Sequence, residues 1–164
     1  MYCRWDLRSN AQAHCVAGGA PSVIARWPFM KQVRILLADD YAPTRESFEA
    51  ILAPHFEIVA TVANGRDLIE AALRLKPELI ILDITMPLRN GIRAAREIRK
   101  SLPETKLLFV TMHTSSAYVK AAFKAGGTGY LVKSSAREEI LAAAMKVLEG
   151  ETYITPNLPS PPGS

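Results

Sequence analysis

The most constraining feature of this sequence is an alternation, repeated five times between residues 32 and 154, of a short apolar run with a longer amphipathic run. Short apolar runs bounded by turn residues are typical of buried strands, and apolar residues spaced by three and four are typical of helices. The predicted strands are Val33–Ala38, Glu57–Val62, Leu79–Leu82, Lys106–Val110 and Gly129–Val132. The predicted helices are Thr44–Leu52, Arg66–Leu75, Gly91–Lys100, Ser116–Lys124 and Ala136–Leu148.

Strands that alternate with helices form parallel sheets, because each helix returns the chain across the sheet in a right-handed crossover. We therefore predict an α/β fold: a doubly wound, five-stranded parallel sheet of the flavodoxin-like order 2-1-3-4-5, with helices on both faces. Ligands of such folds bind beyond the carboxyl ends of the strands, where the strand order reverses. The residues that directly follow the strands are thus the candidates for a functional site.

The periodic pattern places one folded domain at residues 31–154. Residues 1–30 mix Gly, Pro and Trp without periodicity, so we expect a disordered N-terminal extension and a native start at Met30. Residues 155–164 are rich in proline and are expected to form a loose tail or a remnant linker. The chain is expected to have no second folded domain.

Composition excludes several classes of protein. No apolar stretch approaches the roughly 20 residues of a membrane span, and no secretory signal is evident, so a cytoplasmic location without membrane contact is expected. The two cysteines, Cys3 and Cys15, have no partners at metal-ligand spacing. The net charge is +4, of which residues 1–31 carry +3, with four basic residues against Asp6. The rest of the chain is nearly neutral, so no direct DNA binding is expected.

Three carboxylates occupy the expected ligand edge. Asp39 and Asp40 follow the first strand and Asp83 follows the third, and these two strands are neighbours in the order 2-1-3-4-5. Clustered carboxylates need a cation, and an all-oxygen ligand set favours a hard ion such as Mg²⁺, which also binds phosphate oxygens. The pattern therefore predicts a magnesium site that handles a phosphoryl group.

Two further polar residues follow strands at the same edge. Thr111 comes after the fourth strand and Lys133 after the fifth. An ammonium can offset the charge of a transferring phosphoryl group, and a hydroxyl can donate a hydrogen bond to it. Because carboxylates do form aspartyl-phosphates, Asp83 becomes the candidate nucleophile. Each residue alone is weak support, and the joint placement carries the prediction.

Four segments and their spacing resemble a known family: Leu-Ala-Asp-Asp at 37–40, Leu-Asp-Ile-Thr-Met-Pro at 82–87, Val-Thr-Met-His at 110–113 and Gly-Tyr-Leu-Val-Lys at 129–133. Over roughly residues 32–154 the chain resembles receiver domains of two-component response regulators, particularly those of the NarL/LuxR type. The resemblance implies that a sensor histidine kinase phosphorylates Asp83. It implies an Mg²⁺ ion held by Asp40, Asp83 and the backbone carbonyl of Thr85, with Asp39 acting through water.

The resemblance also implies a switch. Lys133 would pair with the phosphoryl group, while Thr111 moves toward it and the ring of Tyr130 turns inward, although Tyr130 could equally be a static core aromatic. An unknown downstream partner, or a phosphorylation-dependent homodimer, would read the change on the surface formed by residues 116–124, 129–132 and 136–148. Such a receiver catalyses only its own phosphorylation and dephosphorylation, so we expect it not to be an enzyme. His113 is more simply a surface residue than a catalytic base, although its place after Thr111 suggests an influence on hydrolysis.

The chain departs from the family pattern at three points. Leu88 stands where many relatives have Gly or a polar residue, and Ser134 stands where many have a proline after a cis peptide bond. The sequence also contains no helix-turn-helix pattern after the domain. The alternative is therefore an N-terminal fragment of a DNA-binding transcriptional regulator whose helix-turn-helix domain is missing from this chain.

Two other classes fit poorly. A haloacid-dehalogenase-type phosphatase needs a second Asp two residues after the nucleophile, and that position holds Thr85. A dinucleotide-binding domain needs a glycine-rich turn after the first strand, where Asp39-Asp40-Tyr41-Ala42-Pro43 stands instead.

Overall fold

The computed structural model describes residues 32–158. The expectations for the extension, for Met30, Cys3 and Cys15, and for the end of the proline-rich tail lie outside these residues. The strands are β1 (Arg34–Ala38), β2 (Glu57–Val62), β3 (Leu79–Leu82), β4 (Lys106–Thr111), β5 (Gly129–Val132) and β6 (Tyr153–Ile154). The helices are α1 (Ala42–Leu52), α2 (Gly65–Leu75), α3 (Gly91–Ser101), α4 (Ser116–Lys124) and α5 (Lys133–Leu148).

The strands form one parallel sheet in the order β2-β1-β3-β4-β5-β6. The predicted order 2-1-3-4-5 and the doubly wound class are therefore confirmed. The sheet has six strands rather than five, because Tyr153–Ile154 pairs with Gly129 and Tyr130 at the free edge of β5. Two residues are too few to show a period, so the sequence pattern gave no signal for this strand.

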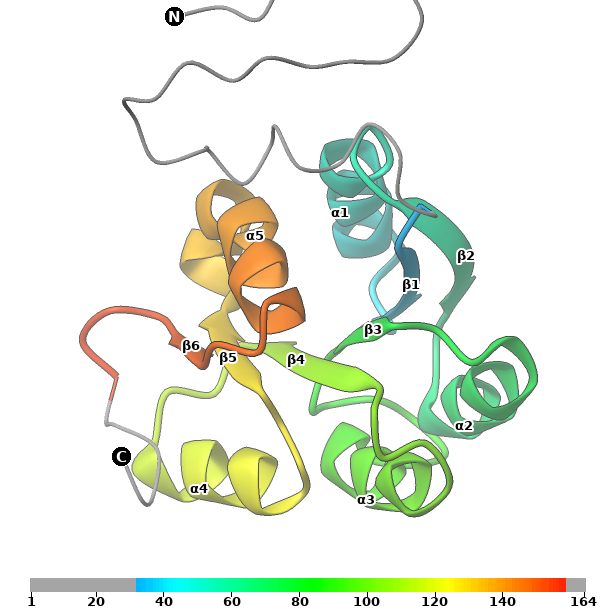
Figure 1. The fold of residues 1–164 in the computed structure, drawn as a ribbon. Coiled ribbons are helices and arrows are strands. Elements are labelled where there is room, and N and C mark those ends of the chain that lie inside the picture. Colours follow the sequence, from blue (N-terminus) through cyan, green and yellow to red (C-terminus); the bar gives the residue numbers. More distant parts are fainter. Residues whose placement is uncertain (1–31, 159–164) are drawn as a thin grey trace, which may run out of the picture. The chain divides into compact units, whose positions relative to one another are not determined.

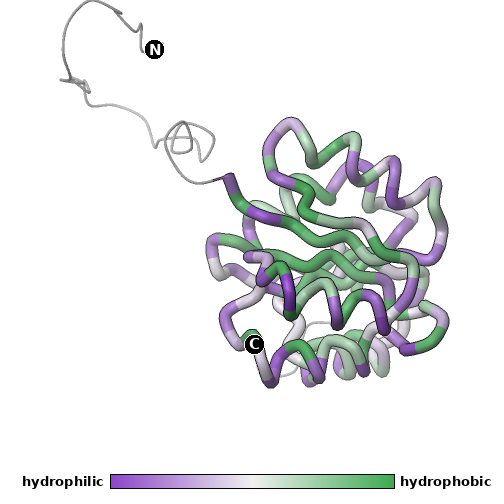
Figure 2. The backbone as a smooth tube through the Cα atoms, turned by 90° about the vertical axis from the view of Figure 1, so that its right-hand side faces the viewer, coloured by the Kyte–Doolittle hydropathy of each residue, from purple (hydrophilic) through white to green (hydrophobic). Residues whose placement is uncertain are grey.

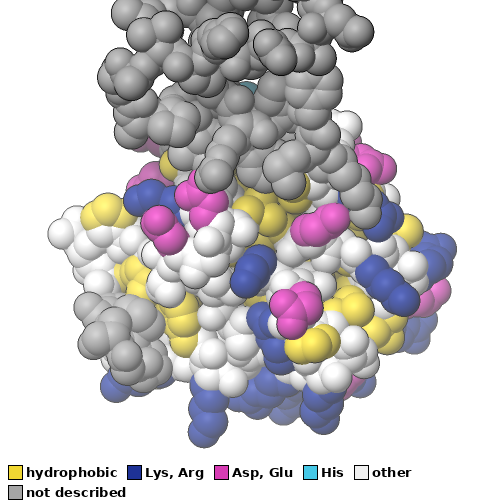
Figure 3. All heavy atoms as spheres, in the orientation of Figure 1, with side chains coloured by type: hydrophobic (Ala, Val, Ile, Leu, Met, Phe, Trp, Pro, Cys, Tyr) yellow, Lys and Arg dark blue, Asp and Glu magenta, His cyan; other side chains and the backbone are white. Residues whose placement is uncertain are grey.

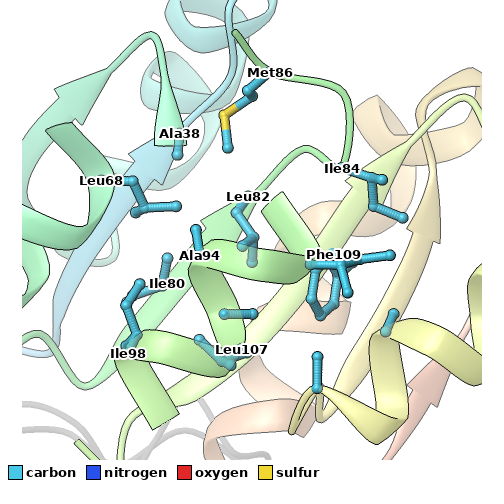
Figure 4. Close-up of a cluster of buried hydrophobic side chains, with 14 of the residues drawn as sticks. Ala38, Leu68, Ile80, Leu82, Ile84, Met86, Ala94, Ile98, Leu107 and Phe109 are labelled. Carbon is cyan, nitrogen blue, oxygen red and sulfur yellow. The ribbon is translucent and has the colours of Figure 1, made fainter. Parts of the chain in front are cut away.

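Helices cover both faces of the sheet, with α1 and α5 on one face and α2, α3 and α4 on the other (Figure 1). Each face has its own apolar cluster. The strands carry hydrophobic residues at consecutive positions, as expected when both faces are buried (Figure 2). Around β3 and β4 the apolar side chains pack closely, with Leu82 and Phe109 inside a cluster completed from α2 and α3 (Figure 4).

The starts of α2 and α3 follow local capping chemistry. Asn64 accepts backbone N–H groups of Arg66 and Asp67 at the start of α2, and Asn90 accepts that of Ile92 at the start of α3. The predicted start of α5 at Ala136 is three residues late, because the helix begins at Lys133 directly after β5. No loop separates β5 from α5, so the backbone at Lys133 continues directly from the strand into the helix.

The surface of the described residues is unevenly charged. Lys and Arg side chains gather along the edge that α3 and α4 occupy (Figure 3), where Arg93, Arg96, Lys100, Lys120 and Lys124 are exposed. Counting charges along the sequence hid this local concentration within a nearly neutral domain. Among the described helices, none is both long enough and apolar enough to cross a lipid bilayer.

Candidate functional site

Three carboxylates meet at the carboxyl ends of β1 and β3. One oxygen atom from each of Asp39, Asp40 and Asp83 lies within 4.8 Å of the others. Asp39 and Asp83 are buried, with 4% and 5% of their surface exposed, while Asp40 faces solvent. The strand order alone produces this meeting, because β1 and β3 are hydrogen-bonded neighbours whose ends lie at one edge.

Lys133 reaches the same point from the end of β5. Its Nζ lies 2.7 Å from Oδ2 of Asp39 and 2.7 Å from Oδ2 of Asp83. The other oxygen of each carboxylate accepts a loop amide, that of Tyr41 at 2.9 Å for Asp39 and that of Thr85 at 3.2 Å for Asp83. Both buried carboxylates are thus held in a fixed direction, with one side facing a single ammonium.

Burial and charge act on these groups in opposite directions. Burial raises the pKa of Asp39 above its usual range, and the hydrogen bond and charge of Lys133 compensate only in part. Burial alone would lower the pKa of Lys133, but its hydrogen bonds to Asp39 and Asp83 outweigh that effect and raise it. One ammonium therefore leaves the group of three acids with excess negative charge, which a divalent cation could balance. The oxygen-only donors suit a hard ion such as Mg²⁺.

The backbone behind Asp83 is supported by α3. The amide of Gly91 donates to the carbonyl of Ile84 at 2.9 Å. A Cβ atom at position 91 would lie 2.0 Å from the carbonyl oxygen of Asp83, so only glycine allows the helix to approach this closely. The close contact with the first turn of α3 thereby fixes the position of the Asp83 backbone at the end of β3.

The structure places Thr111 and Tyr130 on the neighbouring strands β4 and β5. Thr111 is completely buried at the end of β4, in register with Val132, and its Oγ1 accepts the His113 amide at 3.4 Å. Tyr130 is also completely buried, and its hydroxyl donates to the carbonyl of His113 at 2.8 Å. Burial raises the pKa of Tyr130, so this hydroxyl keeps its proton and remains a donor.

His113 has closer contacts with the site than its sequence position indicated. Its Nε2 lies 2.9 Å from Oγ1 of Thr85, two residues after Asp83. Its ring stacks on Tyr118, with centroids 3.8 Å apart and planes 12° from parallel. The β3–α3 and β4–α4 loops are therefore joined beside Asp83 by one imidazole.

Two residues that sequence reasoning missed also support the site. A guanidinium N–H of Arg45, on α1, donates to the backbone carbonyl of Asp39. The hydroxyl of Thr155 accepts the amide of Val132, the residue before Lys133. Arg45 lies within a helix, and Thr155 follows β6, a strand that the sequence analysis did not predict. Arg45 reads as an ordinary helix residue and Thr155 as part of a proline-rich tail.

The departures noted in the sequence have structural outcomes. Leu88 adopts a positive φ of 62° and is 72% exposed, a conformation that glycine or asparagine adopts more readily. No peptide bond within residues 32–158 is cis, so the bond from Lys133 to Ser134 is trans.

Comparison with known protein families and sequences identifies the domain. Residues 35–145 match the family described as the response regulator receiver domain. The oxygen regulatory protein NreC of Staphylococcus epidermidis is 38% identical over 125 residues, which cover 74% of this chain and 57% of NreC. The transcriptional regulatory protein DegU of Brevibacillus brevis is 33% identical over 129 residues, or 77% of this chain and 55% of DegU. The chain thus spans little more than half the length of these relatives.

Solved structures agree with the sequence comparison. A LuxR-family two-component response regulator from an Aurantimonas species superposes with a TM-score of 0.73 at 32% identity, covering 77% of this chain and 92% of that one. The receiver domain of the putative regulator NarL from Mycobacterium tuberculosis gives 0.69 at 30% identity, covering 74% and 100%. With sequence motifs, sheet order and site geometry in agreement, this chain belongs to the response-regulator receiver domain family and resembles its NarL/LuxR-type members.

Proposed function

We propose that Asp83 is the phosphoacceptor of this receiver and that a sensor histidine kinase is its phosphodonor. The observation that carries this proposal is the convergence of Asp39, Asp40, Asp83 and Lys133 from three strand ends. Asp83 offers its carboxylate at the edge where a doubly wound sheet binds ligands. A carboxylate oxygen attacks phosphorus, the phosphorus–nitrogen bond of the phosphohistidine breaks, and the departing imidazole takes up a proton. The product is an aspartyl-phosphate.

The three acids would hold one Mg²⁺ ion. Asp40, Asp83 and the backbone carbonyl of Thr85 would serve as its ligands, and Asp39 would act through a bound water. When bound, the ion neutralises charge that develops on the phosphoryl oxygens. The donor set fits this ion, because three carboxylate oxygens gather within 4.8 Å and a single ammonium faces them.

Lys133 and Thr111 would bind the phosphoryl group once it is attached. Lys133 exchanges its contact with the Asp83 carboxylate for a phosphoryl oxygen, so its charge remains paired throughout. Thr111 donates its hydroxyl after a movement of the β4–α4 loop. Because Tyr130 holds this loop through the carbonyl of His113, the loop and the ring move together. Thr111 and Tyr130 form the proposed switch. A downstream partner or a second copy of the chain would bind to the surface of α4, β5 and α5 that changes with it.

The experiment that tests the phosphoacceptor is intact-mass measurement after incubation with acetyl phosphate and Mg²⁺. The wild type is expected to gain one phosphate, and Asp83→Asn to gain none. Asp67→Asn provides a matched control, since it makes the same substitution on the exposed surface of α2. A folded wild type that gains no phosphate, or an Asp83→Asn variant that gains as much as the wild type, contradicts the proposal.

The switch is tested separately with Tyr130→Phe. This variant keeps the buried ring and removes the hydroxyl that holds the His113 carbonyl. Beryllofluoride, a stable phosphoryl mimic, should produce smaller amide shift changes in α4 and β5 of the variant than in the wild type. Equal changes would identify Tyr130 as a static core residue.

A second candidate function is that the receiver regulates a DNA-binding output domain. It is favoured by the names of the relatives, a transcriptional regulatory protein among them, of which this chain spans 55–57%. The test is the genomic reading frame after residue 164: a helix-turn-helix pattern within about 60 further residues supports this function, and its absence favours a separate partner. The chemistry at Asp83 is the same in both cases.

A further inference from the structure

The chain beyond α5 returns to the sheet edge and lies along β5. Backbone amides of Tyr153 and Thr155 donate to the carbonyls of Thr128 and Tyr130, at 3.3 and 3.0 Å. The Tyr153 hydroxyl donates to a carboxylate oxygen of Glu139 on α5 at 2.7 Å. Ile154 and Leu158 pack against the apolar cluster that includes Tyr130. We refer to residues 153–158 as the C-terminal strap.

The last hydrogen bond between the C-terminal strap and β5 is made by a side chain of the strap. At the end of β5, the Oγ1 atom of Thr155 accepts the Val132 amide at 3.0 Å. Val132 is 7% exposed, so its amide would be costly to leave without an acceptor. The strap backbone does not continue the ladder here, and the hydroxyl replaces the carbonyl of a paired strand.

The residue held in this way occupies the junction from which Lys133 departs. Val132 is the last residue of β5 and also the N-cap of α5, whose first residue is Lys133. Lys133 Nζ in turn contacts Asp39 and Asp83 at 2.7 Å. Because no loop intervenes, a shift of the Val132 amide shifts the base of the Lys133 side chain.

We propose that Thr155 is a positioning residue for the phosphoryl site, and that the C-terminal strap couples Lys133 and Tyr130 to the chain that follows the domain. The proposal rests on the proposed function of Asp83 and Lys133 described above. Thr155 forms a hydrogen bond with the backbone of each residue concerned. Its amide donates to the carbonyl of Tyr130, and its hydroxyl oxygen accepts the amide of Val132, the residue before Lys133. Energetic coupling is reciprocal, so phosphorylation must change the stability of the strap if the strap affects binding at the site.

Two substitutions separate the hydroxyl from the rest of the side chain. Thr155→Val keeps the branched shape and removes the acceptor, whereas Thr155→Ser keeps the acceptor. Thr152→Val is the matched control, because Thr152 is exposed and lies just before the strap. Folding of each variant is checked by circular dichroism. We expect Thr155→Val to weaken the affinity for beryllofluoride in Mg²⁺ by at least about 3-fold, a size typical of coupling through neighbouring contacts.

The pattern of affinities distinguishes positioning from general damage. Affinity for Mg²⁺ alone should not weaken in Thr155→Val, since the acids that would hold the ion lie after β1 and β3. Thr155→Ser and Thr152→Val should both bind beryllofluoride as the wild type does. A smaller effect in Thr155→Val, an equal loss in Thr155→Ser, or a parallel loss of Mg²⁺ affinity overturns the proposal.

Hydrogen exchange on the wild type gives a test that needs no variant. The amides of Tyr153 and Thr155 should change their exchange rates when beryllofluoride binds, while the amide of the exposed residue Thr152 should not. Unchanged rates at Tyr153 and Thr155 overturn the coupling. If the wild type binds no beryllofluoride and gains no phosphate, the proposed function fails together with this inference. If it binds and the strap does not respond, this inference alone fails.

Discussion

Replacing Lys133 with methionine tests how the charges of the site are balanced in the unphosphorylated protein. Methionine keeps an unbranched side chain of similar length and removes the ammonium that contacts both Asp39 and Asp83. In the absence of a metal ion, the variant leaves two buried carboxylates without their counter-charge. We therefore expect the apo protein to lose stability and to regain it when Mg²⁺ is added.

The expected magnitude follows from the burial of the three groups. Removing one partner of a buried ion pair typically costs about 3–5 kcal/mol. The Lys133 side chain is 16% exposed, so water compensates part of the loss and we expect about 2–3 kcal/mol. An ion at a concentration 100 times its dissociation constant adds about 2.7 kcal/mol to the stability of whichever protein binds it, the wild type included. The difference from the wild type narrows only to the extent that the variant binds Mg²⁺ more tightly, which we expect because Lys133 no longer competes with the ion for the Asp39 and Asp83 carboxylates.

The assay is urea unfolding followed by far-ultraviolet circular dichroism, in EDTA and in Mg²⁺. For an m-value near 2 kcal/mol/M the midpoint should fall by roughly 1–1.5 M in EDTA, and Mg²⁺ should narrow this gap. Lys124→Met, an exposed lysine on α4, should change stability by less than about 0.5 kcal/mol. A stable Lys133→Met variant in EDTA, or a loss of the same size with and without Mg²⁺, would refute the reasoning.

Three further predictions use single contacts. Leu88→Gly should stabilise the domain by about 0.5–1 kcal/mol in urea unfolding, because it relieves a positive φ at an exposed side chain; a loss would show that the Leu88 contacts matter more. As pH falls, Mg²⁺ affinity should decline before an ordinary aspartate would protonate, because burial raises the pKa of Asp39 above 3.8. Calorimetric titration at several pH values should show that Mg²⁺ affinity depends less on pH in Asp39→Asn than in the wild type. The same pH dependence in both proteins would contradict this prediction. The neutral Tyr153 hydroxyl donates to Glu139 and burial raises its pKa from 10.0 to about 12, so its stabilising effect is complete below pH 10 and is lost as pH rises through 12. The stability difference between the wild type and Tyr153→Phe should therefore shrink over that range, and a constant difference would argue against the bond.

Much of the fold was predictable because its signals are local. The apolar run of β3, buried at every position, is readable from four consecutive residues. Asp39, Asp83 and Lys133 were identified because each stands directly after a strand, with Asp40 one residue further on, and a parallel sheet brings strand ends to one edge. Their convergence follows from topology, so a one-dimensional pattern was enough to predict it.

The remaining features depend on contacts between distant segments. His113 reaches Thr85 across 28 positions, and Thr155 reaches Val132 across 23. The place of His113 after Thr111 suggests a role in the site but not its contact with Thr85, and no local pattern marks Thr155. Both contacts are set by how the β4–α4 loop and the chain after α5 fold back. The start of α5 was predicted three residues too late, at Ala136, because Lys133 is both a residue of the site and the first residue of the helix.

By itself, the sequence determined the doubly wound class, the strand order and the chemical character of the strand-end residues, because periodicity and chain connectivity leave few alternatives. Only the tertiary structure decided that Lys133 bridges Asp39 and Asp83 at 2.7 Å, that the ring of Tyr130 is buried, and that residues 153–155 pair with β5. Distances between groups and the desolvation of their charges arise when separate elements pack together, and no segment of the chain contains that information alone.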